Sequence, residues 1–392
     1  MKKLLSLVIL SAVILSSFTI SACAAEEKDA IKSGDYTYIL KGNDAQIIKY
    51  TGNSAEVNIP ETIDGHKVIK VGYDLASVES YYSSKYYDDE DDYDSYDSKL
   101  GKFGFAKKNV VSVTMPDTVK ELGYGCFYKC EKLKNVTLSK NLTFIPQYAF
   151  SGCESLASIK LPDSVKEICD ASFNKTNIKS LKLPKNLIYF NNDAFNKSPL
   201  KKFTVDKDNK TYSAKDGVLY NKKKTTLIFY PKYKKNKKFT IPKGVTRVKN
   251  SAVKNNEYLE KITVSKNVKS IGSNAFEGCK KLKSVTFKNR KALTLNEECF
   301  YRCEKLSKVK FSTKAKTTIC MNAFSKCKNL KEVYLPKKVR IKSFGIGYTQ
   351  AYYSSEEEDY ITQKIKGFTI KGKKNSSAHK YAKKNKFKFI SV

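Results

Sequence analysis

A large apolar residue, usually phenylalanine, recurs along the middle of the chain at a nearly constant spacing. The anchors are Phe127, Phe150, Phe173 and Phe195, followed by Val253, Phe276, Phe300 and Phe324. The steps between them are 23, 23 and 22 residues in the first group and 23, 24 and 24 in the second. Around the anchors the pattern I-x-x-x-A-F-x-x-C-x-x-L-x-x-V-x-L-P returns. A fixed period of this length is typical of a solenoid, in which each unit buries its apolar face against its neighbours.

The pattern also predicts the local structure of each unit. Its L-x-x-V-x-L segment ends in alternating apolar and polar positions, as a half-buried strand does. Proline follows at Pro162, Pro184 and Pro336 and ends the strand because it has no N–H to donate. A second short strand is expected to lead to Ile145, Ile168, Ile271 and Ile319. The A-F-x-x-C segment suits a helical turn with phenylalanine facing inward, and coils stacked about 4.8 Å apart would form parallel sheets.

Nine cysteines lie within the repeats. Five of them share the position three residues after the anchor, which Thr176, Ser198 and Asn256 occupy in other copies. The five are Cys130, Cys153, Cys279, Cys303 and Cys327. A free cysteine suits a position that requires a small buried side chain, so we expect a ladder of free thiols. Disulfides between adjacent coils stay open as an alternative, and zinc is disfavoured because no histidine accompanies the spacing.

The A-F-x-x-C-x-x-L-x-x-V-x-L-P pattern resembles the BspA-type leucine-rich repeats of bacterial surface proteins, over roughly residues 34–392. The segment that opens with GDYTYILKGNDAQIIKY resembles the N-terminal β-cap of that family. DGVLYNKKKTTLIFYPKYKKNKKFTIPKGV, from Asp216, resembles its inserted hairpin, and FTIKGKKNSSAHKYAKKNKFKFI, from Phe368, its closing strand–helix–strand unit. The resemblance implies a right-handed, β-rich leucine-rich repeat solenoid of short strands and helical turns. It also implies a role at the cell surface, in adhesion or protein–protein interaction.

Two acidic, tyrosine-rich segments interrupt this basic solenoid: YYSSKYYDDEDDYDSYDSK at 81–99 and YTQAYYSSEEEDYITQK at 348–364. We expect solvated loops, with docking on the basic coils of the same or a neighbouring molecule as the alternative. A calcium loop is disfavoured because 88–97 lacks the glycine turn and spaced ligands of an EF-hand. The predicted divisions are a signal peptide (1–23), β-cap (34–72), acidic insertion (73–100), repeats (101–205), inserted hairpin (206–242), repeats (243–345), acidic insertion (346–366) and C-terminal unit (367–392).

The first 23 residues have the pattern of an export signal. Lys2 and Lys3 precede an apolar stretch, LLSLVILSAVILSSF, that is short for a membrane span. The segment ends in ISAC, which resembles the lipobox of bacterial lipoproteins, with Cys23 as the residue that receives the lipid. Two acyl chains on Cys23 would hold the protein stably at the cell surface. The alternative is ordinary secretion after cleavage behind Ala24.

The strong positive charge bears on possible partners. Lys and Arg number 74 against 39 Asp and Glu, a formal net charge of +35. In each strand the residues between the apolar ones point outward and stack into columns of Lys, Ser and Thr. The candidate binding face comprises Lys160, Lys182, Lys202, Lys261, Lys308, Lys310 and Tyr334. Its expected partner is a surface or extracellular protein; electrostatic binding of anionic polymers such as cell-wall polyanions, nucleic acid or acidic glycans is the alternative. An ordinary solvated β-face would look similar.

The motifs that accompany catalysis are missing from the sequence. It contains neither a phosphate-binding G-x-x-x-x-G-K-[ST] loop nor a G-x-S-x-G nucleophile elbow. The two histidines, His66 and His379, fall in a turn and a short terminal helix, where we expect exposed structural positions. We therefore predict a protein without enzymatic activity, cofactor or metal, and without a specific small-molecule ligand.

The assignment of Cys23 gives a direct test. Expressed in a bacterium that processes lipoproteins, the natural chain should partition with membranes and carry a diacylglyceryl-modified Cys23 at its mature N-terminus. Cys23→Ala should abolish both, because the thiol that accepts the lipid is gone. Intact-mass spectrometry and membrane fractionation measure the two effects. An unlipidated N-terminus at Ala25 in the natural chain would establish ordinary secretion instead.

Overall fold

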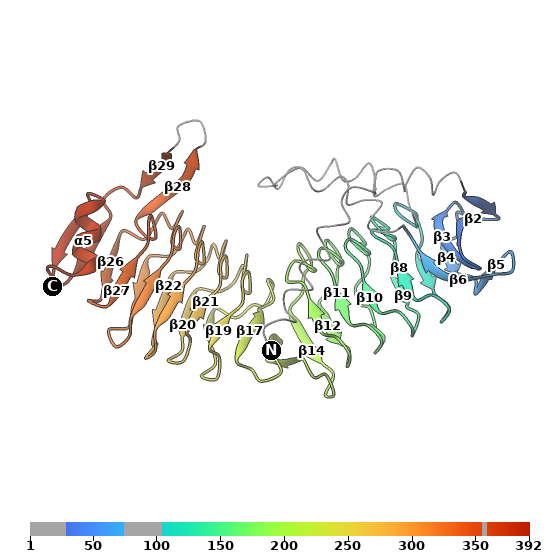
Figure 1. The fold of residues 1–392 in the computed structure, drawn as a ribbon, viewed down its shortest axis with the longest axis horizontal. Helices are drawn as coiled ribbons and strands as arrows, with labels where there is room; N and C mark the ends of the chain where they lie inside the picture. The colour runs from blue at the N-terminus through green and yellow to red at the C-terminus, as the bar shows by residue number, and fades with distance from the viewer. Residues whose placement is uncertain (1–28, 74–103, 355–358) are drawn as a thin grey trace. The chain divides into compact units, whose positions relative to one another are not determined.

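The computed structural model describes residues 29–73, 104–354 and 359–392. The chain divides into two compact units, Met1–Ser198 and Pro199–Val392. Within each unit it winds through successive coils of short strands, and strands of neighbouring coils pair side by side (Figure 1). The 23-residue period therefore corresponds to one coil, and the predicted solenoid is confirmed. Cys23 and the whole first acidic segment, 81–99, lie outside the described residues.

The first unit opens with a small mixed sheet whose strands run in the order β1-β2-β3-β6-β5. Their bounds are β1 Ile31–Ser33, β2 Tyr36–Lys41, β3 Asp44–Tyr50, β5 Thr62–Ile63 and β6 His66–Val71. Strand β8 (Glu121–Leu122) of the coil that follows pairs in parallel with β6. The first coil is therefore a direct continuation of this sheet.

The coils of the first unit contribute strands to two parallel ladders. One contains β4 (Glu56–Asn58), β7 (Ser112–Thr114) and β9 (Asn135–Thr137). The other contains β10 (Phe144–Ile145), β11 (Glu167–Ile168) and β13 (Tyr189–Phe190), so the predicted strands end at Ile145 and Ile168. Strand β12 spans Ser180–Leu183. The pattern also predicts a strand at 158–160, but these residues form none.

The second unit contains an antiparallel insertion and then regular coils. Strand β14 (Lys202–Val205) precedes the antiparallel strands β15 (Tyr212–Lys215), β16 (Val218–Asn221) and β17 (Thr226–Phe229). From β17 the ladder continues in parallel through β19 (Arg247–Val248), β21 (Ser270–Ile271), β23 (Leu293–Leu295), β25 (Thr317–Ile319) and β27 (Val339–Ile341). The insertion is therefore one end of a coil ladder.

A second parallel ladder in this unit runs in the order β18-β20-β22-β24-β26-β30-β31. Its strands are β18 Lys238–Thr240, β20 Lys261–Val264, β22 Ser284–Phe287, β24 Lys308–Lys310, β26 Glu332–Leu335, β30 Thr369–Gly372 and β31 Lys388–Ser391. Helix α5 (Ser377–Lys384) joins β30 to β31. The Ser376 side chain caps it by accepting a hydrogen bond from the N–H of His379.

The turns around the anchors bond both within and between coils. In the coil of Phe127, the N–H groups of Gly125, Phe127 and Lys129 donate to carbonyls of the next coil at 2.8–3.1 Å. The N–H groups of the alternate residues donate to carbonyls three residues back in the same coil. Gly125 and Lys129 have positive φ, 57° and 54°, and so do the equivalent residues of the other coils except Asp193, two residues before Phe195. These left-handed residues make each segment a chain of tight turns and not a continuous helix.

The anchor side chains stack on one another inside the coils. The rings of Phe127 and Phe150 lie 5.3 Å apart and nearly parallel, and those of Phe300 and Phe324 lie 5.1 Å apart. All four side chains are fully buried. Because each ring touches the equivalent ring of the next coil, the phenylalanine column joins neighbouring coils through dispersion and aromatic contacts.

The cysteines three residues after the anchors form a second internal column. Each thiol donates to the carbonyl of the preceding coil's anchor, for example Cys153 Sγ to Phe127 O at 3.1 Å and Cys303 Sγ to Phe276 O at 3.1 Å. Ser198 makes the equivalent bond to Phe173 O. All the described cysteines are free thiols. The position therefore requires a small hydrogen-bond donor, which serine and cysteine both supply.

The second acidic segment forms a β-hairpin and not the solvated loop expected from the sequence. Residues 348–364 were expected to form a solvated loop, but β28 (Tyr348–Ser354) and β29 (Asp359–Lys364) pair as an antiparallel hairpin. The hairpin projects from the turns of the last coils (Figure 1), where the Asn322 side chain donates to Ala351 O. Alternating β-favouring residues on both arms, such as Tyr352 opposite Ile361, supply cross-strand pairs that a loop would lack.

The phenylalanine column predicts a large cost for removing one ring. Phe300→Ala should lower the free energy of unfolding by about 3–5 kcal/mol, because it leaves a cavity and ends the stacking on both sides. Urea unfolding followed by circular dichroism measures the change. Tyr352→Ala is a matched control, since Tyr352 is 46% exposed on the hairpin and should shift stability by about 0.5 kcal/mol or less. Equal losses in both variants would contradict a structural role for the column.

Burial also predicts which thiols resist alkylation. Burial raises the pKa of Cys130 and of Cys279 to about 12, so both stay protonated at pH 8 and should not react with iodoacetamide in the native protein. Burial, together with the nearby carboxylates of Glu167 and Asp170, raises the pKa of Cys169 to about 11. Because Cys169 is nevertheless partly exposed, it should react first.

Peptide mass spectrometry after native and denaturing alkylation measures this order. Every described cysteine should become modified in guanidinium chloride without a reductant. Peptides cross-linked between adjacent coils in an unreduced digest would instead show that disulfides had formed.

Candidate functional site: the strand face

The parallel ladder from β18 to β31 presents two columns of side chains on its outer side, which we call the strand face. One column follows the register through Thr240, Thr263, Thr286, Lys310, Tyr334 and Lys371. The neighbouring column contains Lys238, Lys261, Ser284, Lys308, Glu332, Thr369 and Lys388. The intervening residues Ile262, Val285 and Val333 are buried. Strand alternation therefore fixes which side chains can meet a partner.

The structure brings four of the predicted face residues together. Lys261, Lys308, Lys310 and Tyr334 all lie on this ladder and are exposed. Lys202 lies on β14, outside the ladder, although in the same unit. Lys160 and Lys182 belong to the first unit: Lys182 lies on β12 and Lys160 on the segment that forms no strand. The seven residues do not form one continuous patch within either unit.

The lysines at the centre of the strand face have uncompensated charges. Within the residues that the structure describes, Lys261, Lys308 and Lys310 make no ion pair. The acidic residue on the face, Glu332, pairs with Lys371 at 2.9 Å. The centre is therefore cationic, with threonine and serine hydroxyls between the lysines, and its flat surface suits an extended or acidic partner.

Tyr334 is the large aromatic residue of this face and is 42% exposed. It lies in register between Lys310 on β24 and Lys371 on β30. An exposed tyrosine offers contact area and a hydroxyl at low entropic cost, which is why tyrosine is frequent at the energetic centres of interfaces.

Beside the face, a ladder of ion pairs joins successive coils. Glu260 contacts Lys237 at 3.5 Å and Lys283 at 2.8 Å, and the three residues lie 23 positions apart. The hydrogen bond from the Lys283 side chain lowers the pKa of the Glu260 carboxyl, which keeps it ionised at neutral pH. These lysines are partly neutralised, whereas those at the centre of the face are not.

The columns of outward-facing residues that were expected from the repeat pattern do not include Lys238, Lys371 and Lys388. Lys238 follows the inserted hairpin, and the other two belong to the closing strand–helix–strand unit. None of them lies inside a full copy of the repeat pattern, so the 23-residue spacing could not assign them to the face. Their alternation with Phe239, Ile370 and Phe389 is the signal that could have placed them.

The histidines make structural contacts. His66 Nδ1 lies 3.1 Å from Asn43 O. His379 Nδ1 accepts from the N–H of Asn375, and its ring stacks on Phe389 at 4.4 Å. Both side chains are half-buried, so the expectation of exposed positions is wrong. Across the described ranges, histidine, cysteine and acidic side chains form no group of three that could hold a metal ion, and no helix is long and apolar enough to cross a membrane.

Comparison with known proteins identifies a matching family model and similar solved structures. The family model of the BspA type leucine rich repeat region matches residues 98–225 and 228–349, in six copies. The crystal structure of the pneumococcal vaccine antigen PcpA is similar at a TM-score of 0.58 and 20% identity, over 93% of this chain and 98% of that one. A leucine-rich cell surface protein from Faecalibacterium prausnitzii is 24% identical over 80% of this chain and 95% of its own, at a TM-score of 0.43.

No curated protein matches the chain significantly. At this identity the likeness to PcpA establishes the fold, while the family model spans more than half of the residues. The chain belongs to the family of BspA-type leucine-rich repeat proteins.

Proposed function

We propose that this chain is a non-enzymatic, exported interaction protein whose partner is another surface or extracellular protein, bound along the strand face. The observation that carries the proposal is the uncompensated cationic centre at Lys261, Lys308 and Lys310, next to the exposed Tyr334. A solvated structural face would gain nothing from three unpaired lysines, whose mutual repulsion slightly destabilises the folded state.

The shape of the face supports a protein partner. Its two columns run over several strands, and the exposed Tyr334 lies in register with Lys310 and Lys371; an exposed aromatic residue among polar and charged side chains is common at protein interfaces. Adhesion, in which many such molecules act together on one surface, does not require high affinity at each contact because multivalency multiplies it.

The proposed location rests on the sequence. The export signal and the lipobox-like ISAC would attach the mature chain to the membrane through Cys23, leaving the solenoid outside. The similar Faecalibacterium prausnitzii protein is itself described as a cell surface protein. Secretion without an anchor remains the alternative that the Cys23 experiment decides.

The three lysines at the centre of the strand face can be replaced by uncharged residues that occupy the same columns in other coils. In Lys261→Ser/Lys308→Ser/Lys310→Thr, each lysine is replaced by a residue found in its own column, Ser284 or Thr286. Binding of the soluble chain to immobilised extracellular-matrix proteins and to intact cells, measured by biolayer interferometry and flow cytometry, should weaken roughly tenfold, since each exposed charge contributes a fraction of a kcal/mol.

The matched control is the turn-control variant, Lys280→Ser/Lys305→Ser/Lys328→Ser. It removes the same net charge from exposed turn lysines of the same coils. It should bind like the natural chain. Equal weakening in both variants would mean that net charge, and not the strand face, determines binding. Unchanged binding in both would place the contact elsewhere.

A further inference from the structure

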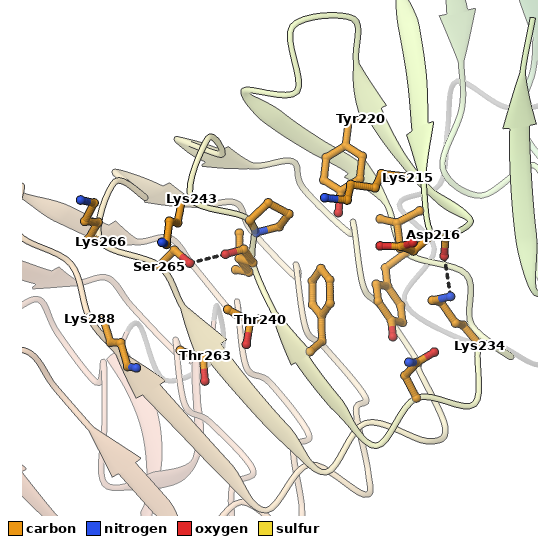
Figure 2. A pocket seen from close by; sticks show the side chains of 16 residues that line it. Lys215, Asp216, Tyr220, Lys234, Thr240, Lys243, Thr263, Ser265, Lys266 and Lys288 are labelled. Carbon is orange, nitrogen blue, oxygen red and sulfur yellow. Dashed lines mark hydrogen bonds between the residues drawn. The ribbon is translucent and has the colours of Figure 1, made fainter.

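A cleft lies where the inserted strands meet the first coils of the second unit. Its volume is about 720 Å³. One wall comes from the insertion, with Lys215 at the end of β15 and Lys234 after β17; the other comes from the residues that follow β18, β20 and β22. Figure 2 shows Lys243, Lys266 and Lys288 on this second wall, across from Lys215 and Lys234.

The charge inside the cleft is strongly unbalanced. Five lysines line it, against a single carboxylate, Asp216. Lys234 donates to the backbone carbonyl of Asp216 at 2.5 Å. Among the described residues Lys215, Lys243, Lys266 and Lys288 have no ion-pair partner, and all four are exposed. Because the walls are close to one another, the field of these cations concentrates in the cleft.

The cleft also contains an unsatisfied polar group. Tyr230 lines it and is 1% exposed, yet its hydroxyl has no hydrogen-bond partner among the residues that the structure describes. Burial raises the pKa of Tyr230, so the hydroxyl stays protonated and can donate. A buried donor without a partner destabilises the folded state, and a ligand oxygen would satisfy it. Thr240 and Thr263 add hydroxyls along the same wall.

We infer that this cleft binds an anionic polysaccharide, whose sulfate or carboxylate groups contact the lysines and whose hydroxyls meet Thr240, Thr263 and Tyr230. Lys243 and Lys266 follow equivalent strands of adjacent coils, and adjacent coils are about 4.8 Å apart. The cations therefore repeat along the wall and can meet a chain of repeated anions. This site extends beyond the proposed protein-binding role of the strand face, with which it shares two threonines.

The composition of the cleft favours a glycan over other polyanions. Lysine is a point charge that accepts any oxyanion geometry, whereas sites specialised for phosphate or a single carboxylate usually employ bidentate arginine. Single-stranded nucleic acid requires exposed aromatic platforms for its bases, while the aromatic residues here, Tyr220, Tyr230 and Phe239, are buried or half-buried. Threonine and tyrosine hydroxyls suit a ligand that is rich in hydroxyls itself.

The test uses the mature soluble chain and four probes: heparin, hyaluronan, duplex DNA and poly-glutamate. Lys243→Gln/Lys266→Gln/Lys288→Gln should weaken binding to heparin, to hyaluronan or to both at least tenfold, and should reduce the slope of log K against log salt by about three. The turn-control variant, with the same net charge, should change affinity less than threefold. Heparin and hyaluronan separate sulfate from carboxylate recognition.

Tyr230→Phe is the second arm, because it removes the unsatisfied hydroxyl without changing charge. Glycan affinity should fall threefold or more, while the urea midpoint stays equal or rises. Three results would overturn the inference: no binding of either glycan, equal losses in the cleft and turn-control variants, or an equal cleft-dependent loss for DNA or poly-glutamate. Binding of matrix proteins by the Lys243→Gln/Lys266→Gln/Lys288→Gln variant is measured separately. A failure of the glycan proposal can therefore be distinguished from a failure of the strand-face proposal.

Discussion

Hydrogen bonding between the turns of consecutive coils is the constraint on which the rest of the structure depends. In the turns around Phe127, Phe150, Val253, Phe276 and Phe300, alternate N–H groups bond to the next coil, and the others bond within their own coil. This satisfies the backbone polar groups at the buried anchors, which would otherwise be costly. In these turns the residues two before and two after the anchor have positive φ, and the strain of those that are not glycine, about 1–3 kcal/mol each, is offset by the bonds that they make possible.

Once the coils are fixed at one spacing, every position of the repeat becomes a column. Phenylalanines stack on phenylalanines, and thiols or serine hydroxyls donate to the anchor carbonyl of the coil before them. Lysine and glutamate alternate beside the strand face, as in Lys237, Glu260 and Lys283. Identical neighbours suit apolar and hydrogen-bonding groups, whereas repeated lysines repel one another unless an acid or an external anion lies between them.

This explains why the two candidate binding surfaces lie where they do. At Lys237 and Lys283 an acid of the chain itself compensates the charge, but at Lys261, Lys308 and Lys310 none does among the described residues. In the cleft the inserted strands bring Lys215 and Lys234 opposite the coil lysines, which increases the imbalance. Protein and glycan partners are therefore proposed at two surfaces of one unit, which share Thr240 and Thr263, and each is tested with its own lysine variant against one charge-matched control.

The sequence by itself determined the coil. Its period predicted the solenoid, the buried Phe and Cys columns and the strands that lead to Ile145, Ile168, Ile271 and Ile319, because alternation and spacing are local properties of the chain. It also placed Lys261, Lys308, Lys310 and Tyr334 on one face. The tertiary structure alone decided the hairpin at β28 and β29, the missing strand at 158–160, and the cleft. Those depend on pairing between segments distant in sequence: no spacing rule predicts that Lys215 faces Lys243, or that the Tyr230 hydroxyl is buried with no partner in the described part of the chain.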